Sequence, residues 1–450
     1  MESLEKFKGS KTSVTSPLDL LPDEIWLRIF IELPVSTLCR CRTVSKKCYS
    51  ISLDETIWQH HSAEFFEPGP LPPRTKSSAN SWEKFYRIQR NWNRGTATKV
   101  SSFKAHNNNV TALKLRGNIL VTGSSEYRLK VWNIKTGKPD LTIDFGADIS
   151  CVDFLEDMDV IACGSYYGDF GCKLFSLSKG ECLGRFIEDH WIGTQCMAMN
   201  KEYIVLGTCK GVIHVLSWAD GRRVALFHNH PKAVAGVRLL GRNTLLSVST
   251  NGTIDVFDIA MNELLHQYTL PSTSISTCAF DYQGEGRDLL CIAPSGSIFH
   301  LRWTAVYCNS KPSQCSEIEE DKKYRYIFSQ DPEVHYKNEK ISYRTLCAGM
   351  DAKYNHGVIG SLVSYPPRSH LLVYNSLKGL SSKDGICGPN SLNAENGTLD
   401  FTPDTDSPVF NILGIDDERV VAGCSRGFIY CFEFGFNDSK EFPRFRTPAL

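Results

Sequence analysis

The 450-residue sequence predicts an all-β, seven-bladed β-propeller preceded by a small all-α module. Two observations predict this fold class. A short strand-like pattern recurs seven times over residues 101–437, mostly at intervals of about 40–45 residues, the length of one four-stranded propeller blade. Residues 17–62 lack this pattern and carry apolar residues at helical spacing instead. We therefore expect two modules of different type in one chain.

The composition narrows the function classes. Lysine plus arginine and aspartate plus glutamate each number 50, so the formal net charge is +0. A balanced charge argues against a protein that coats nucleic acid or an anionic membrane. There is no apolar run of membrane-spanning length, and the polar first residues lack the apolar core of a signal peptide. We expect a cytoplasmic or nuclear protein, with neither nucleic acid nor membrane as a partner.

The 17 cysteines suggest buried thiols rather than disulfides or metal ligands. Most stand singly inside apolar, strand-like runs, where a free thiol behaves as a small apolar side chain. Cys39 and Cys41 with Cys48, and Cys308 with Cys315, lack the paired cysteine and histidine spacing of a zinc site. We expect no metal and no other cofactor.

The first helix of the small module is well marked. In residues 21–24 (Leu-Pro-Asp-Glu), proline suits a first turn whose N–H groups are unpaired, and the two acids favour the positive end of the helix dipole. Ile25, Ile29 and Leu33 follow at four-residue spacing, and Pro34 ends the helix. The spacing predicts one broad apolar face.

Two further helical stretches complete the module. One carries Leu38, Val44 and Tyr49, and the other begins near residues 53–55 and includes Trp58. Three helices in about 45 residues bury little surface by themselves. Periodicity alone leaves two interpretations open: an ordinary bundle with every apolar residue facing inward, or a module whose apolar face needs a partner.

A polar tail over residues 1–16 precedes this module, and residues 63–100 follow it. The proline-rich run 67–73 predicts an extended, stiff spacer. An aromatic helix is then expected, because large apolar residues recur at three- and four-residue steps: Trp82, Phe85, Tyr86, Ile88 and Trp92. A loosely attached helix would expose many aromatic side chains to water. Residues 438–450 are expected to form a C-terminal tail.

The repeats predict one hairpin after another. Their seven copies are residues 128–134, 171–177, 212–218, 253–259, 297–303, 370–376 and 428–434. Most follow an apolar run that ends in a small-residue turn, as expected for paired strands. Residues 98–103 are expected to form the outer strand of the last blade and close the ring. A solenoid is the alternative, but it would need capping sequence at its open end.

Two insertions interrupt the last repeats. Residues 304–340 are rich in charge, and residues 380–407 are rich in glycine, asparagine, serine and proline. Both exceed ordinary blade loops. Loops of such length in a compact ring are either disordered or functional.

The helical module resembles the F-box, through which substrate receptors dock on a Skp-type adaptor of a cullin ubiquitin ligase. The resemblance rests on residues 21–38 together with Val44 and Trp58. It implies that the apolar face enters a groove of the adaptor. The residues that it assigns to this contact are Leu21, Pro22, Ile25, Ile29, Leu33, Pro34 and Leu38.

The first repeat resembles a WD repeat. Residues 105–106 (Ala-His) and 132–133 (Trp-Asn) stand where that family has Gly-His and Trp-Asp, with Ser124 and Glu126 near its hydrogen-bonding serine and aspartate. We expect His106 to stabilise this blade, whereas His60, His61, His228 and His230 are expected on solvated loops. The run from Trp82 to Trp92 is similar to the segment that joins F-box to propeller in F-box/WD-repeat proteins.

Known members of the F-box/WD-repeat family read phosphorylated peptides with arginines at the top of the propeller, since phosphate needs such donors. The corresponding positions here hold residues other than arginine. The candidate substrate-binding cations that remain are Arg128, Lys210 and Arg426.

The resemblance implies a non-catalytic substrate-recognition subunit of an SCF-type ubiquitin ligase. Its partners would be a Skp-type adaptor, a cullin through that adaptor, and an unknown protein substrate on the propeller. The sequence has no P-loop, nucleophile elbow, HExxH or dinucleotide-binding glycine motif. Two alternatives stay open: a WD-repeat scaffold in a stable complex without ubiquitin transfer, and an enzyme or small-molecule binder that uses the central channel.

Overall fold

The computed structural model describes most of the chain. The described residues are 21–66, 81–94, 97–167, 171–186, 193–217, 219–271, 274–280, 288–294, 297–303, 317–328, 330–338, 344–351, 356–364, 367–375, 390–391, 409–416 and 418–435. The tails expected at 1–16 and 438–450 lie outside them, as does the proline-rich run 67–73. Contacts divide the chain into two compact units: a helical unit (residues 1–89 with 436–450) and a β unit (residues 90–435).

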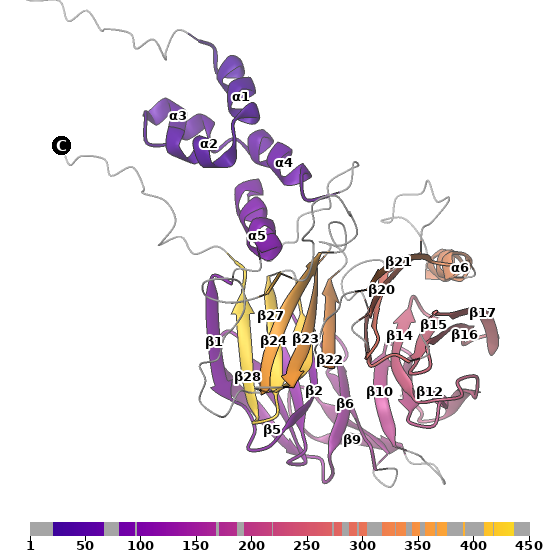
Figure 1. Cartoon of the computed structure of the whole chain (residues 1–450). Coiled ribbons are helices and arrows are strands. Elements are labelled where there is room, and N and C mark those ends of the chain that lie inside the picture. Colours follow the sequence, from indigo (N-terminus) through magenta and orange to yellow (C-terminus); the bar gives the residue numbers. More distant parts are fainter. Residues whose placement is uncertain are drawn as a thin grey trace, which may run out of the picture. The chain divides into compact units, whose positions relative to one another are not determined.

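Among the described residues, the helical unit contains four short helices and most of a fifth, which are labelled in Figure 1. They are α1 (Asp23–Glu32), α2 (Val35–Cys41), α3 (Lys46–Ile51), α4 (Glu55–Ala63) and α5 (Trp82–Arg94). The single second helix that the sequence predicts is thus two helices. Ser45 separates them, because its hydroxyl accepts a hydrogen bond from the Cys48 N–H (3.0 Å) and so starts α3.

Proline and aspartate start the other short helices. Pro22 precedes α1 and Pro34 precedes α2, where the missing N–H costs nothing. The Asp54 carboxylate accepts a hydrogen bond from the Thr56 N–H (2.8 Å) at the start of α4.

The helices share a small aromatic core. Its buried members are Phe30, Leu38, Cys39, Cys48, Ile57, Trp58, Phe65 and Tyr86. The ring centroid of Tyr86, from α5, lies 5.5 Å from that of Trp58 and 5.2 Å from that of Phe65. The Trp58 Nε1–H donates to the Ser52 carbonyl (2.8 Å), so its one polar group is satisfied inside the core. The first part of the aromatic helix therefore completes the core of the helical unit.

The described strands of the β unit form seven four-stranded antiparallel sheets. Three of them follow the chain: β2 (Val110–Arg116), β3 (Ile119–Ser124), β4 (Arg128–Asn133) and β5 (Lys138–Asp144); β6 (Ile149–Leu155), β7 (Val160–Ser165), β8 (Cys172–Ser176) and β9 (Cys182–Phe186); β10 (Thr194–Met199), β11 (Tyr203–Thr208), β12 (Ile213–Ser217) and β13 (Arg223–Phe227).

Three more continue in the same order. They are β14 (Val234–Leu240), β15 (Thr244–Ser249), β16 (Thr253–Asp258) and β17 (Glu263–Thr269); β18 (Thr277–Phe280), β19 (Asp288–Ile292), β20 (Ser297–Arg302) and β21 (Glu333–Asn338); β22 (Arg344–Asp351), β23 (His356–Ser364), β24 (Pro367–Asn375) and β25 (Asn390–Ser391).

The last sheet joins the two ends of the β unit. Strands β26 (Phe410–Ile415), β27 (Arg419–Cys424) and β28 (Phe428–Glu433) pair in order, and β1 (Lys99–Lys104) adds antiparallel to β28. Figure 1 shows β1, from the start of the unit, beside the yellow β28. The expected outer strand from residues 98–103 is therefore confirmed.

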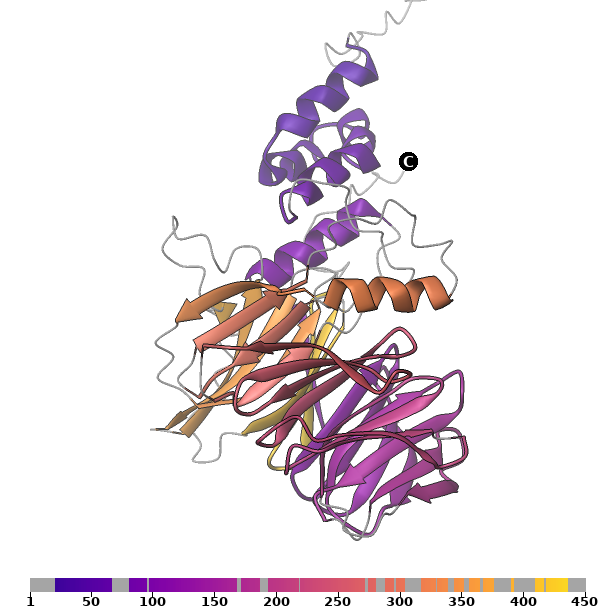
Figure 2. The same ribbon diagram turned by 90° about the vertical axis from the view of Figure 1, so that its right-hand side faces the viewer.

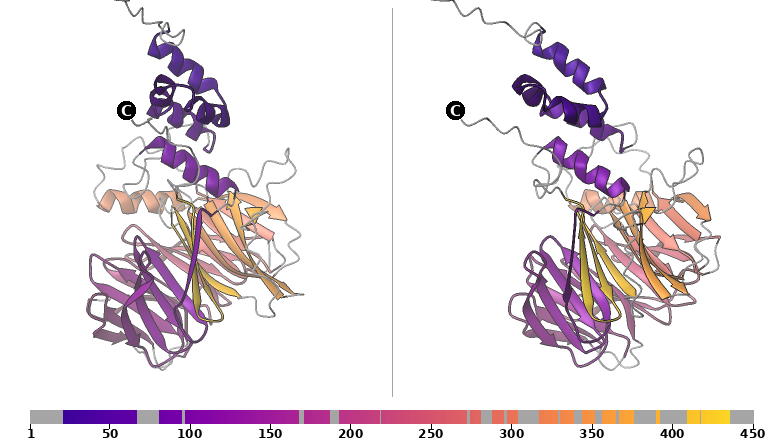
Figure 3. Two further views of the ribbon diagram at one scale, coloured as in Figure 1. Left: turned by 90° about the vertical axis from the view of Figure 1, so that its left-hand side faces the viewer. Right: turned by 60° about the vertical axis from the view of Figure 1, so that its left-hand side comes forward.

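The first strand of each sheet contacts the first strand of the next sheet, from β2 through β6, β10, β14, β18 and β22 to β26, and β26 contacts β2. Figure 3 shows, from the side, sheets of successive colours next to one another. The β unit is therefore a β-propeller, as the repeats predict. The solenoid alternative is excluded, because the first and last sheets touch.

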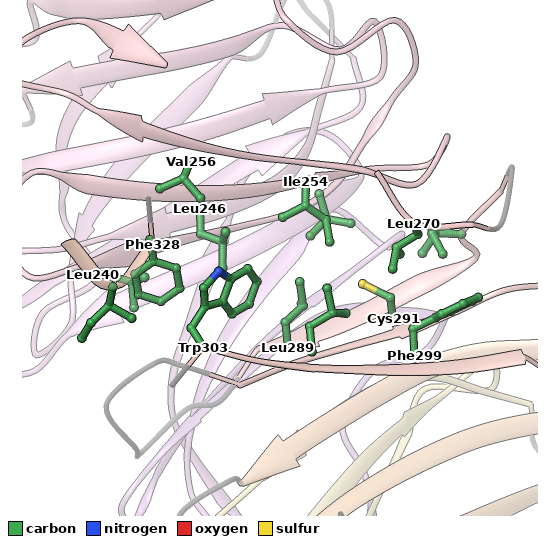
Figure 4. Close-up of a cluster of buried hydrophobic side chains, with 14 of the residues drawn as sticks. Leu240, Leu246, Ile254, Val256, Leu270, Leu289, Cys291, Phe299, Trp303 and Phe328 are labelled. Atoms are coloured by element: carbon green, nitrogen blue, oxygen red, sulfur yellow. The ribbon is translucent and has the colours of Figure 1, made fainter. Parts of the chain in front are cut away.

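Apolar side chains fill the space between neighbouring sheets. Figure 4 shows one such cluster, formed by the β14–β17 and β18–β21 sheets with α6 (Glu317–Phe328). The Trp303 and Phe328 rings pack with centroids 5.0 Å apart, and the Trp303 Nε1–H donates to the Gln330 carbonyl (3.1 Å). Figure 2 shows α6 beside this part of the propeller, where it contacts β15 and β17.

The described residues of the insertion at 304–340 form regular structure, so the disordered interpretation is wrong for them. It supplies α6 and also β21, the outer strand of its sheet, whose residues pair with β20 from Ser297↔Asn338 to Arg302↔Glu333. Of the insertion at 380–407, only β25 belongs to the described residues. None of the helices that the structure describes is long and apolar enough to cross a membrane.

Candidate functional site

One side of α1 presents apolar side chains to solvent. Leu21, Ile25 and Ile29 are each exposed by about 40% of their full surface (40%, 40% and 41%). Ile25 and Ile29 lie four residues apart on one side of α1, and Leu21 precedes the helix. Their exposure excludes an ordinary bundle in which every apolar residue faces inward, whereas the need for a partner stays a prediction. We call these three residues the α1 face.

The α1 face rests on a packed support. Phe30 is buried and packs edge-to-face against Trp26, with ring centroids 5.8 Å apart. At the other end of the helix, Lys47 Nζ lies 3.0 Å from the Asp23 carboxylate and donates to the Leu21 carbonyl (3.2 Å). The start of α1 is thereby tied to α3, and the exposed side chains have a defined place.

The seven residues assigned to adaptor binding differ in how much of their surface is exposed. Pro22 and Pro34 are exposed beside the α1 face, and Leu33 is half-buried. Leu38 has no exposed surface and lies in the aromatic core. In this fold Leu38 packs inside the core of the helical unit, and it could contact a partner only if that core opened. The other six residues stay a prediction for the contact.

A second group of exposed apolar residues was not assigned to any contact from the sequence. Val44, Tyr49 and Leu53 are 65%, 37% and 41% exposed. Val44 precedes α3 and Leu53 follows it, so neither lies within a helix. The sequence carries no periodic signal for such positions, since helical spacing does not apply to turns.

The three candidate substrate-binding cations all lie in or next to turns between second and third strands. Arg128 follows the β3–β4 turn, Lys210 lies between β11 and β12, and Arg426 lies between β27 and β28. All three are exposed. Because these turns occupy equivalent positions in their sheets, the topology brings the three cations to the same end of the propeller. Arg128 and Arg426 come from adjacent sheets, and Lys210 comes from two sheets beyond Arg128.

His106 is buried in a hydrogen-bonded network of the first sheet, as expected. Its Nδ1 lies 2.6 Å from a Glu126 carboxylate oxygen, and its Nε2 lies 2.7 Å from the Thr122 hydroxyl. The Trp132 Nε1–H donates to the same hydroxyl (2.9 Å). Thr122 therefore has the hydroxyl role expected of Ser124, whose oxygen accepts from the Glu126 N–H instead.

The sheet β14–β17 contains a similar network that sequence reasoning missed. His230 is buried, not on a solvated loop; its Nδ1 lies 2.9 Å from the Thr253 hydroxyl and its Nε2 lies 2.7 Å from the Ser247 hydroxyl. His230 precedes Ser247 by nearly the same distance as His106 precedes Thr122. The spacing between the histidine and the hydroxyl residue could have predicted this network from the sequence. The tryptophan that marks the first repeat is replaced by Phe257 here, so the second network is harder to recognise.

Two family models match the chain. A model described as F-box-like matches residues 18–64, and a model described as WD domain, G-beta repeat matches residues 97–133. The first covers α1 to α4, and the second covers the closing strand and the first three strands of the β2–β5 sheet.

Curated relatives match part of the chain. An F-box protein of Saccharomyces cerevisiae is 26% identical over 151 residues, which cover 27% of this chain and 23% of that protein. The probable E3 ubiquitin ligase complex SCF subunit scon-2 of Neurospora crassa is 35% identical over 104 residues, 19% of this chain and 16% of that protein. The chain thus spans less than a quarter of the length of these relatives.

A relative with a different name and a solved structure also match the chain. The U3 small nucleolar RNA-associated protein 15 homolog of Gallus gallus is 24% identical over 172 residues, 37% of this chain and 32% of that protein. Among solved structures, the computationally designed Ika8 protein aligns with a TM-score of 0.46 and 17% identity, over 76% of this chain and 99% of that one.

The two family models, the SCF-subunit relatives and the order of the two units agree with one another. The chain therefore carries an F-box-like region at residues 18–64, followed by a region similar to a WD repeat at residues 97–133 where the β-propeller begins.

Proposed function

We propose that this chain is the substrate-recognition subunit of an SCF-type ubiquitin ligase. The helical unit docks on a Skp-type adaptor, which connects it to a cullin, and the propeller binds the protein to be modified. The observation that carries the proposal is the α1 face: three large apolar side chains, each about 40% exposed, within the region that matches the F-box-like model. An apolar helix surface laid into a groove is a recurrent mode of recognition.

In this proposal the chain is not itself a catalyst. It holds the target near the ubiquitin-transferring partners, and the gain in rate comes from proximity. Leu21, Pro22, Ile25, Ile29, Leu33 and Pro34 contact the adaptor, and the substrate meets the propeller end that carries Arg128, Lys210 and Arg426. Such a protein acts in the cytoplasm, the nucleus or both.

We propose further that the ring has seven blades. The support is the closed series of contacts among the first strands of the seven four-stranded sheets, in which each sheet forms one blade. A seven-bladed ring leaves no sheet edge open between the first and last repeats.

A WD-repeat scaffold without ubiquitin transfer is the second candidate. Its support is the similarity to the U3 small nucleolar RNA-associated protein 15 homolog. The half-lives of the proteins that bind the propeller distinguish a scaffold from a ligase subunit. If loss of this chain leaves the half-lives of all proteins bound to the propeller unchanged, the scaffold is the correct function.

Affinity purification of the full chain tests the docking proposal. The wild type should capture a Skp-type adaptor and a cullin together with propeller-bound proteins. The double variant Leu21→Ala, Pro22→Ala should lose the adaptor and cullin but keep the propeller-bound proteins. A folded wild-type chain that captures no adaptor would refute the proposal.

A further inference from the structure

Lys47 of α3 holds the first residue of the α1 face. Its Nζ donates a hydrogen bond to the Leu21 carbonyl (3.2 Å) and lies 3.0 Å from the carboxylate of Asp23, the first residue of α1. Leu21 precedes the helix, and the first backbone bonds of α1 run from the Ile25 and Trp26 N–H groups to the Pro22 carbonyl instead. The Lys47 ammonium group therefore supplies a tether for Leu21 that the backbone of α1 does not provide.

Lys47 extends from a helix that is itself fixed in place. Ser45 starts α3 by accepting a hydrogen bond from the Cys48 N–H (3.0 Å), and the Cys48 side chain is buried in the aromatic core. The Ser50 hydroxyl donates to the Lys47 carbonyl within the same helix (2.9 Å). Because α3 rests on the core, the contact with Lys47 fixes Leu21 relative to that core.

The place of Lys47 is unfavourable for α3 alone. Lys46 and Lys47 are the first two residues of this helix, and its first turn contains no acidic residue. A cation at a helix N-terminus meets the positive end of the helix dipole. The Lys47 side chain keeps only 27% of its surface, whereas Lys46 is exposed. The contacts of Lys47 with the start of α1 offset the electrostatic penalty that its charge imposes on α3.

We propose that Lys47 is a positioning residue for adaptor docking, an inference that rests on the proposed function. By holding the Leu21 carbonyl, Lys47 keeps the Leu21 side chain in line with Ile25 and Ile29 before the adaptor binds. A surface that is ordered in advance binds more tightly, because less conformational entropy is lost on binding. Lys47 thus acts through Leu21 and not through an adaptor contact of its own.

Adaptor titration of the full chain, followed by calorimetry, tests this inference. Lys47→Gln should weaken adaptor binding about three- to tenfold, because it removes the charged donor that holds Leu21. Lys46→Gln is the matched control: it removes the same charge from the adjacent exposed position and should bind as the wild type does. Lys47→Arg retains a charged donor and should bind more tightly than Lys47→Gln.

A double-variant cycle shows whether Lys47 acts through Leu21. The Leu21→Ala variant leaves no large side chain to position, although Ile25 and Ile29 remain for docking. In this background Lys47→Gln should therefore change the adaptor affinity by less than about twofold. A direct contact between Lys47 and the adaptor would give the same loss in both backgrounds.

Hydrogen exchange of the free chain gives a readout that needs no adaptor. The N–H groups of Ile25 and Trp26 donate to the Pro22 carbonyl at 3.1 and 3.3 Å in the first turn of α1. Lys47→Gln should make these two groups exchange about threefold faster or more, because the start of α1 opens more often. Lys46→Gln should leave their exchange unchanged.

The inference is overturned if Lys47→Gln retains either the wild-type adaptor affinity or the wild-type exchange. It is also overturned by equal losses in Lys47→Gln and Lys46→Gln, which would indicate general charge attraction, or by an undiminished loss in the Leu21→Ala background. If the folded wild type binds no adaptor, the proposed ligase function fails, whereas the exchange measurement still decides whether Lys47 orders the α1 face.

Discussion

Arg42 and Glu83 form a two-pronged ion pair inside the helical unit. Arg42 Nη1 and Nη2 donate to the two Glu83 carboxylate oxygens at 2.8 and 2.9 Å, and the Arg42 side chain is only 9% exposed. The guanidinium also donates to the Ser52 hydroxyl and carbonyl and lies 5.2 Å from the centre of the Trp58 ring. The pair therefore links α2, the aromatic core and α5.

Glu83→Gln should lower the free energy of unfolding of the helical unit by about 2–3 kcal/mol, because the buried Arg42 charge would lose its balancing carboxylate. Far-ultraviolet circular dichroism at the helix band, during denaturant unfolding of the full chain, measures the change. Glu64→Gln, at an exposed position of the same unit, is the matched control and should have little effect. Equal stability of the two variants would show that the pair contributes nothing net.

Leu38→Ala should destabilise the helical unit by about 2–5 kcal/mol, since it leaves a cavity in the aromatic core. At a temperature where this variant is folded, its adaptor affinity should equal that of the wild type, because Leu38 has no exposed surface. Denaturant unfolding and adaptor titration, measured on the same preparation, separate the two effects. Weakened adaptor binding by a fully folded Leu38→Ala variant would show that Leu38 contributes to the adaptor contact.

Stability of the propeller should depend on pH through His106. Burial lowers the pKa of His106 to about 4 from an ordinary value of 6.5. The unfolded chain therefore takes up a proton before the folded chain does, and stability is lost as the pH falls from about 6.5 to 4. This difference corresponds to about 3 kcal/mol, present in full above pH 6.5.

Unfolding free energies measured between pH 7 and 4 check this prediction. His106→Gln should show a shallower loss toward acid pH than the wild type. His228→Gln, which removes an exposed histidine, should keep the wild-type slope. His230 has its pKa lowered by burial in the same direction, so His106→Gln should retain part of the slope. A slope unaffected by His106→Gln would contradict the account.

Gly427→Ala should cost more than about 3 kcal/mol of propeller stability. The residue has a φ of +78°, and an added Cβ would lie 2.0 Å from the His106 carbonyl oxygen and 2.6 Å from that of Asn108. These are backbone atoms, which cannot move aside cheaply. Gly117→Ala is the control, since φ is +56° there and no atom lies within 4 Å; its cost should be about 1 kcal/mol. Thermal unfolding of both variants compares them, and equal costs would disprove the steric argument.

Features that depend on local sequence patterns, such as the start of a helix, could be predicted from the sequence. The start of α1 followed from Pro22 with its acidic neighbours, and the closing strand β1 followed from the expected closure of the ring by an outer strand. Burial across the chain could not be predicted in the same way. Leu38 lies in a helix of seven residues, too short for periodicity to define a face, and its burial depends on Trp58 and Tyr86, which come from other helices.

Networks and charges in the ring were also beyond sequence reasoning. Thr122 and Ser124 both stand near the expected hydroxyl position, and only the strand register shows which one reaches His106. The charged residues that line the centre of the propeller among the described residues come from β2, β6 and β14, and Lys114 and Arg238 are 124 positions apart. Only the closure of the ring brings them together.

The central claim is that the α1 face is the docking surface for a Skp-type adaptor. The most direct test is the adaptor dissociation constant of the full chain, compared with that of Ile25→Ser, Ile29→Ser. Burial of two such side chains corresponds to a weakening of about 100-fold or more in the double variant, with no loss of thermal stability. Met261→Ser, at a 61% exposed position of the propeller, should bind as the wild type does. Equal adaptor affinity of the wild type and the double variant would contradict the account.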